Sequence, residues 1–350
     1  MCCIIILSHF EFLGESEIFG EFYKTYLHNP TLAVDYFFML SGFGIYLSSK
    51  RPECSIKGGL KFAVDKVKKI YPAYIVSLFI ATPVFILQEI KLSNGFTPII
   101  NTVIRLFVDF TLLQLLTGIL SFTHGINGVC WFLSSLFVIY MLSPLFLRKL
   151  DSMKSMNPIR MLLFTLFTLM LFSFGAYYIE SLHLLNGRLN DIWYTHPFVR
   201  CWYVVIGMIV GKITSEKTRK YGNTVELLMA LISLIFCFLR NSISLFININ
   251  ALRIIDVVVC SALLYVFANG KGKLSSLLCN LSGLSKYLLT LYLFHYPVRM
   301  AISFCFEEIG YKGEIYYLYE VFLIISFTIF LVSLWTYINR RKGTTKYDNN

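Results

Sequence analysis

The sequence has few charged residues and none of the motifs that mark a soluble enzyme. Only 15% of its 350 residues are Asp, Glu, Lys or Arg, and 57% are hydrophobic, whereas soluble domains carry about 25% charged residues. Apolar runs of about 17 to 25 residues, the length that crosses a bilayer, recur along the whole chain. These features exclude a soluble domain. They predict an all-α membrane helix bundle, with one domain over residues 1–338 and a cytoplasmic polar tail over 339–350.

The sequence also lacks the patterns of a disulfide framework, a metal site or a common hydrolase. Its nine cysteines form no C-x-x-C pair, and most lie within apolar runs, where cysteine behaves as a small hydrophobic residue. The motifs G-x-S-x-G, G-x-x-x-x-G-K-[ST], H-E-x-x-H and His-x4-Asp are absent. We therefore expect no metal. The net charge of +11 does not indicate a nucleic-acid partner, because membrane proteins concentrate Lys and Arg in cytoplasmic loops.

Ten stretches are predicted to cross the membrane. They are residues 1–13, 33–49, 70–90, 129–147, 161–180, 198–211, 224–239, 252–269, 285–306 and 317–338. An eleventh apolar region, residues 99–121, contains Arg105 and Asp109, each of which costs roughly 2.5 to 3.5 kcal/mol near the centre of a helix. We expect a re-entrant or interfacial segment there, on the outer side.

The distribution of basic residues supports this count. With ten spans and a cytoplasmic N-terminus, 22 of the 31 Lys and Arg residues fall in the inner loops and the tail, so that both termini are expected in the cytoplasm. Counting residues 99–121 as a span would place the basic loops on alternating sides. The inner basic residues are Lys50, Arg51, Lys57, Lys61, Lys66, Lys68, Lys69, Arg148, Lys149, Lys154, Arg160, Lys212, Lys217, Arg219, Lys220, Lys271, Lys273, Lys286, Arg340, Arg341, Lys342 and Lys346.

Ionisable side chains within predicted spans are costly, so each is a candidate functional residue. His9 lies four residues, or roughly 6 Å, below the expected outer boundary, where a histidine can move a proton near neutral pH. Asp35 lies at a similar depth on the next span, and a carboxylate can orient an imidazole that acts as a general base. The alternatives are a hydrogen-bonded core histidine and a first-turn acid that complements the helix dipole.

Two later spans also carry ionisable residues. His295 lies near the middle of the ninth span, two residues before Pro297, which frees backbone carbonyls that must face protein or water. It either lines a cavity or is a buried structural histidine. Arg200 lies just inside the outer end of the sixth span and either snorkels outward or holds an anionic group. Gly207 and Gly211 follow it at a spacing typical of close helix packing.

Six blocks in order resemble the membrane acyltransferase-3 family, bacterial polytopic enzymes that O-acylate extracytoplasmic glycans. The blocks extend over nearly the whole chain. They are LSHF (His9), AVDYFFMLSGFGI (Asp35, Ser41), DKVKKIYPAY (Lys69), GVCWFLSSLFVIYMLSPL (Trp131), HPFVRCWYVVIGMIVG (Arg200) and SKYLLTLYLFHYPV (His295). The resemblance implies a protein of the bacterial cytoplasmic membrane. It would move an acyl group, expected to be acetyl, from cytoplasmic acetyl-CoA to a hydroxyl of an extracytoplasmic or lipid-linked polysaccharide.

The resemblance also implies roles for single residues. His9 would be the general base or a transient acyl carrier, and Asp35 would orient it. The residues expected to bind substrate in the cavity are Arg200, His295, Trp131 and Ser41. The anionic CoA nucleotide cannot cross the bilayer, so its phosphates are expected at three lysines of the inner face, which are Lys66, Lys68 and Lys69. Membrane lipid and the glycan acceptor are the expected partners.

The sequence departs from the family's pattern in two places. The family usually has an arginine about ten residues before the first-helix histidine, which would precede Met1, so we expect a shortened first helix. It also usually has arginine where this chain has Lys69, which keeps the charge but not the bidentate fork. The alternatives to an active transferase are an inactive family member and a transporter or flippase of a glycan precursor, although no internal repeat relates the two halves.

Overall fold

The computed structural model describes residues 1–350 apart from 49–50, 93–96, 117–119, 154–155, 183–188, 217–218 and 348–350. Nine helical segments in these ranges are long and apolar enough to cross a membrane. They comprise α3 (Thr31–Leu47), α5 (Tyr71–Leu92), α8 (Trp131–Ser152), α9 (Pro158–Ser181), α11 (Pro197–Glu216), α12 (Asn223–Ser244), α13 (Ile249–Ala268), α15 (Ser285–Ile309) and α16 (Glu314–Tyr347). The predicted all-α polytopic bundle is confirmed.

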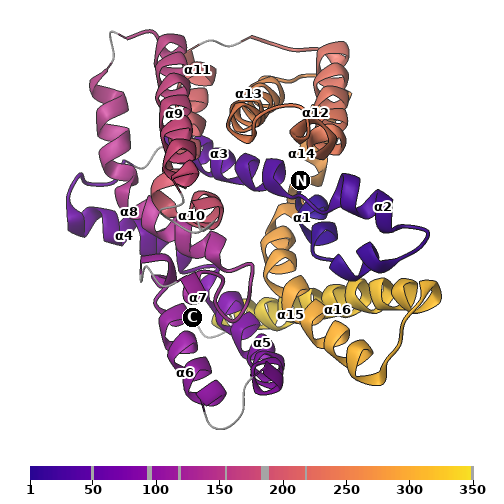
Figure 1. Ribbon diagram of the computed structural model, residues 1–350. Helices are drawn as coiled ribbons and strands as arrows, with labels where there is room; N and C mark the ends of the chain where they lie inside the picture. The colour runs from indigo at the N-terminus through magenta and orange to yellow at the C-terminus, as the bar shows by residue number, and fades with distance from the viewer. Residues whose placement is uncertain are drawn as a thin grey trace.

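The first predicted span has a different form from the other nine. Its helix, α1 (Cys2–Ser8), has seven residues, whereas crossing a bilayer takes about 20. His9 caps this helix, and the chain then bends into the 3-10 helix η1 (Glu11–Glu15). Next come α2 (Gly20–Phe22) and η2 (Tyr23–Leu27), which lead into α3. Figure 1 shows α1 in the centre of the molecule, between α3 and α15.

The eleventh apolar region forms a helix that packs on α5, and the chain then reverses direction. Its elements are α6 (Thr97–Phe110), η3 (Gln114–Leu116) and α7 (Leu120–Thr123). α6 has 14 residues, too few to span, and it runs beside α5, where the Tyr74 hydroxyl donates to the Asp109 carbonyl at 2.7 Å. The chain reverses at Leu112, which has a positive φ of 57°. On its return, the Ile126 N–H donates to the Asp109 carboxylate at 2.8 Å. The described part of residues 99–121 holds no candidate span, and its position as a re-entrant or interfacial segment on the outer side stays a prediction.

The remaining elements close the two ends of the bundle. They are α4 (Ile56–Val67), α10 (Leu189–Thr195), α14 (Lys273–Asn280) and η4 (Leu281–Leu284). α4 packs on the second half of α8, where a Cβ on Gly59 would collide with the Met141 carbonyl. We call this end, which carries the lysines of α4, the basic end. The opposite end, where Glu314 of α16 accepts hydrogen bonds from Ser16 and Glu17 just after η1, is called the η1 end.

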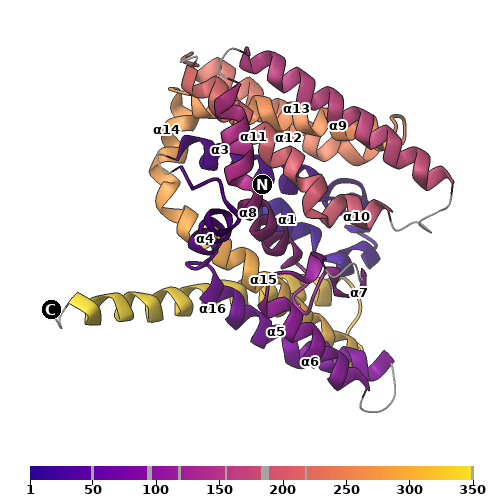
Figure 2. The ribbon, with the colours of Figure 1, turned by 90° about the vertical axis from the view of Figure 1, so that its left-hand side faces the viewer.

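Both ribbon views place α9, α12 and α13 on one flank and α5, α6 and α16 on the other, with α3 between them (Figures 1 and 2). α16 extends well beyond its neighbours toward the C-terminus (Figure 2). Helix therefore continues into the expected polar tail through Tyr347, and residues 348–350 lie outside the described residues. Among the predicted inner basic residues, Lys50, Lys154 and Lys217 also lie outside them, as do the side chains of Lys286, Arg340, Arg341, Lys342 and Lys346.

The spanning helices α3 and α11 approach each other closely. A Cβ on Gly42 would collide with the Val204 carbonyl, and a Cβ on Gly207 would collide with the Met39 carbonyl. These two glycines therefore let the backbones touch, which is the usual role of small residues between membrane helices. The expected packing role of Gly207 is confirmed, and Gly211 lies against the side chain of Tyr46.

We predict that Gly42→Ala destabilises the fold, because the added methyl group must push α3 away from α11. Overpacking of this kind costs about 1–3 kcal/mol. Gly44→Ala on the same helix is the matched control, since a Cβ there meets nothing within 4 Å. Thermal unfolding of the purified protein in detergent should show a lowered midpoint for Gly42→Ala only. Equal midpoints for the two variants would contradict the close contact.

Candidate active site

His9 lies on the wall of a cavity with a volume of about 360 Å³. Three histidines line this cavity together with a group of aromatic rings. The lining residues include His9, His28, His124, Trp131, Tyr194, Tyr292 and Tyr296. Within the described residues, no group of His, Cys, Asp and Glu side chains has the arrangement of a metal site. We call this space the histidine cavity.

The structure brings His9 and His295 together from opposite ends of the sequence. Their ring centroids lie 5.3 Å apart, and the edge of Tyr296 meets the His9 ring at 5.2 Å. His295 is fully buried, and its Nδ1 lies 2.7 Å from the Tyr292 carbonyl. Because a carbonyl can only accept, Nδ1 carries the proton and Nε2 is left as an acceptor. No described group bonds that Nε2.

Asp35 pairs with Arg200 and makes no hydrogen bond to His9 among the described residues. The carboxylate accepts from the guanidinium Nη1, and the two side chains are 0% and 1% exposed. Arg200 Nε also donates to the Tyr194 carbonyl at 2.6 Å. The expected Asp35–His9 pair is therefore corrected to an Asp35–Arg200 pair. An arginine at this depth would otherwise be an unpaired buried charge, and it outcompetes a neutral imidazole for the carboxylate.

Arg200 itself does not reach the histidine cavity. Aromatic rings enclose its guanidinium, with centroids 4.9 to 5.9 Å from the central carbon. The rings belong to Phe38, Trp131, Tyr194 and Tyr203. The Arg200 guanidinium is thus stabilised by the Asp35 carboxylate and by the faces of these rings. It does not snorkel outward, and it is not free to hold an anionic ligand. Both expected roles of Arg200 are therefore corrected. Trp131 and Tyr194 line the cavity. The Asp35–Arg200 ion pair therefore supports the wall of the histidine cavity from behind.

A second buried ion pair was not anticipated from the sequence. Arg240 on α12 forms an ion pair with Asp256 on α13 through three hydrogen bonds of 2.7 to 3.1 Å. Both side chains are buried. The available signal was an aspartate inside one predicted span, 252–269, and an arginine directly after the preceding one, 224–239. Such residues pair in membranes because the cost of either one alone is high.

A second cavity of about 320 Å³ lies next to the histidine cavity, toward the basic end. Ile5, Val34 and Tyr292 line both of them. The walls of the second space are mostly apolar, and Ser41 lines it while its hydroxyl donates to the Phe37 carbonyl at 2.9 Å. We call this space the apolar cavity. Of the expected substrate-binding residues, Trp131 and Ser41 therefore line cavities, whereas Arg200 and His295 lie behind the walls.

The three lysines expected at the CoA phosphates lie at the basic end. Lys66 is half-buried with its ammonium 5.2 Å from the Phe62 ring, and the exposed Lys68 pairs with Asp65. Lys69 is exposed and directly precedes Ile70, which lines the apolar cavity. The apolar cavity is therefore bordered by the segment that carries the lysines.

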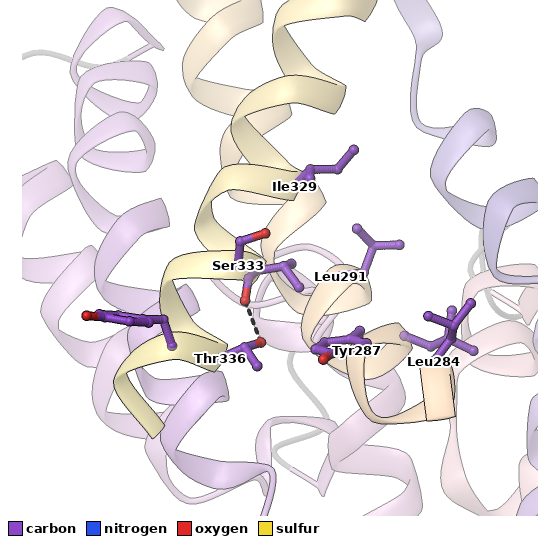
Figure 3. A pocket seen from close by; sticks show the side chains of 9 residues that line it. Leu284, Tyr287, Leu291, Ile329, Ser333 and Thr336 are labelled. Atoms are coloured by element: carbon purple, nitrogen blue, oxygen red, sulfur yellow. Dashed lines mark hydrogen bonds between the residues drawn. The ribbon is translucent and has the colours of Figure 1, made fainter. Parts of the chain in front are cut away.

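A groove of about 490 Å³ lies between α15 and α16. Figure 3 shows Tyr287 and Leu291 of α15 facing Ile329 and Thr336 of α16 across it. Leu288 lines both this groove and the apolar cavity. A single side chain therefore belongs to the walls of both spaces.

One family model, for an acyltransferase domain, matches residues 1–338, which include both cavities and α4. The chain belongs to the acyltransferase-3 family. The family predicted from the six blocks is thus confirmed, and this acyltransferase-3 chain is a multi-pass membrane acyltransferase. No curated protein and no solved structure matches the chain.

We predict that Asp35→Ala destabilises this acyltransferase-3 protein by about 3–5 kcal/mol, because it leaves the Arg200 charge buried and unpaired. Asp151→Ala is the matched control. It removes a pair with Arg51 in which the side chains are 42% and 41% exposed, and such surface pairs contribute about 0–1 kcal/mol. Thermal unfolding in detergent measures both effects. Similar losses in the two variants would contradict the structural role of the Asp35–Arg200 pair.

Proposed function

We propose that this protein moves an acyl group, in the first instance acetyl, from acyl-CoA at the basic end to a hydroxyl of an extracytoplasmic or lipid-linked polysaccharide at the η1 end. The observation that carries the proposal is the wall of Ile5, Val34 and Tyr292, which the histidine cavity and the apolar cavity share. A donor and an acceptor that approach from opposite ends would meet at this wall.

The charges of the two ends support this direction of transfer. The exposed face of α4 and the turn after it carry Lys57, Lys61, Lys68 and Lys69, whereas η1 and the segment after it carry Glu11, Glu15, Glu17 and Glu21. By the positive-inside rule, the basic end faces the cytoplasm. We place it on that side of a bacterial cytoplasmic membrane, where the lysines would meet the CoA phosphates and where both termini would lie.

The donor would occupy the apolar cavity with its thioester toward the shared wall. Apolar walls suit the uncharged thioester arm of acyl-CoA, because contact between the walls and the arm removes the apolar surface of both from water. The nucleotide would stay outside, since moving its phosphates into a low-dielectric interior is prohibitive. Lys69, next to the cavity residue Ile70, is the lysine placed best for this contact.

His9 would act as the general base on the acceptor hydroxyl. Its imidazole accepts the hydroxyl proton while the oxygen forms the new bond to the thioester carbonyl carbon. The carbon–sulfur bond then breaks, and the CoA thiolate leaves and takes up the proton from His9. General-base catalysis contributes typically 10²- to 10⁴-fold in rate. His295 and Tyr296, whose rings contact His9, are positioning residues for the imidazole.

We predict that His9→Ala lowers the rate of acyl transfer by about 10²- to 10⁴-fold, the contribution of a general base. Membranes that contain the protein are incubated with labelled acyl-CoA, and label in the glycan fraction is counted. His196→Ala is the matched control, since His196 stacks on Phe198 and lines neither cavity. Unchanged labelling by His9→Ala would exclude the assignment. Glycan translocation that needs no acyl-CoA would favour a flippase instead.

A further inference from the structure

A third cavity, of about 400 Å³, lies at the η1 end between η1 and the adjoining parts of α15 and α16. Glu11 lines this cavity and the histidine cavity alike. The reaction described above uses none of its other residues. We call it the glutamate cavity. Its position makes it a candidate for the part of an acceptor that extends away from the reacting hydroxyl.

Two pairs of aromatic rings line the glutamate cavity. Phe12 and Tyr317 lie with ring centroids 6.2 Å apart, and Phe306 and Tyr311 lie 5.9 Å apart. Hydrogen-bonding groups line the same cavity, including the buried Glu320, whose carboxylate accepts from Ser303. Sites for small polar molecules combine such apolar faces with a few placed polar groups. A sugar ring presents the matching surfaces, apolar C–H faces and a rim of hydroxyls.

Arg299 lies between the glutamate cavity and His9. It lines the cavity, and its guanidinium donates to Glu11 at 3.1 Å. It also lies 5.9 Å from the ring of Tyr296, which contacts His9. Its Nε is buried and bonds no described group. Glu11 and its partner Arg299 therefore lie where the two cavities adjoin.

The charge of the wall restricts the chemistry of that molecule. Four carboxylates line the cavity, and only two cations do. The carboxylates are Glu11, Glu15, Glu307 and Glu320, and the cations are Arg299 and Lys312. An excess of two negative charges repels an anionic ligand and attracts a cationic one, and the effect weakens with salt.

We propose that the glutamate cavity binds the sugar residue adjacent to the one that is acylated, and that it selects neutral or amino sugars over sugars with carboxylate, sulfate or phosphate groups. This inference rests on the proposed function, because it identifies the class of acceptor for the same site. The acceptor then lies across both cavities, with its reacting hydroxyl at His9 and its neighbouring ring against the aromatic side chains of the glutamate cavity.

The test measures direct binding of tetrasaccharides to the full chain in detergent, without an acyl donor. The probes are an N-acetylglucosamine tetramer (neutral), a glucosamine tetramer (cationic) and a galacturonate tetramer (anionic). We expect the neutral and cationic tetramers to bind at least tenfold more tightly than the anionic one at low salt. Glu307→Lys should reduce this preference at least threefold, and Tyr311→Ala should weaken the binding of all three.

Glu21→Lys is the matched control, since it makes the same charge change at an exposed position of the η1 end outside the cavity. It should leave the preference unchanged. A wild-type chain that binds none of the tetramers, or a preference that Glu307→Lys does not alter, would overturn the inference. Acyl-CoA-dependent transfer is assayed on the same samples. Transfer without the predicted preference rejects the cavity assignment alone, whereas the predicted binding without transfer rejects the proposed enzyme activity.

Discussion

The buried ion pair between Asp35 and Arg200 is the interaction on which the rest of the site depends. Either charge alone in the bilayer interior would be costly, so the pair holds α3 and α11 at a fixed rotation and height. The close backbone contact at Gly42 and Gly207 makes this approach sterically allowed. The same guanidinium supports Trp131 and Tyr194 from behind, and these two rings form part of the wall that faces His9. The contact between α3 and α11 thus determines the packing of the two helices, the pairing of their buried charges and the shape of the histidine cavity.

Sequence reasoning predicts the long apolar helices well, because a run of about 20 apolar residues is the length that crosses a bilayer. It predicted the bundle, and it predicted that residues 99–121 do not cross. The structure gives the physical reason: Asp109 is used to hold the returning chain at Ile126, and Arg105 lies 5.2 Å from the Phe85 ring. Polar groups that would be unpaired in a straight span acquire partners when the segment turns back.

Sequence reasoning does not predict the rotation of each helix about its axis, and rotation decides which residues meet. Asp35 and His9 are predicted at similar depth, yet the carboxylate faces Arg200, 165 positions away. His9 meets His295, which no local pattern relates to it. The cavities could not be predicted for the same reason, since their walls combine side chains from α1, α3, α8 and α15. Only the chain as a whole defines them.

The central claim is that the acyl group crosses the membrane where the two cavities adjoin. They adjoin at the wall that is formed by Ile5, Val34 and Tyr292. The most direct measurement uses sealed, sided membrane vesicles with labelled acyl-CoA on one face and the glycan acceptor on the other. We predict labelled glycan when acyl-CoA is supplied at the α4 face and the acceptor at the η1 face, and no label when the two are exchanged. Labelling only when donor and acceptor are on the same face would contradict transfer through the shared wall.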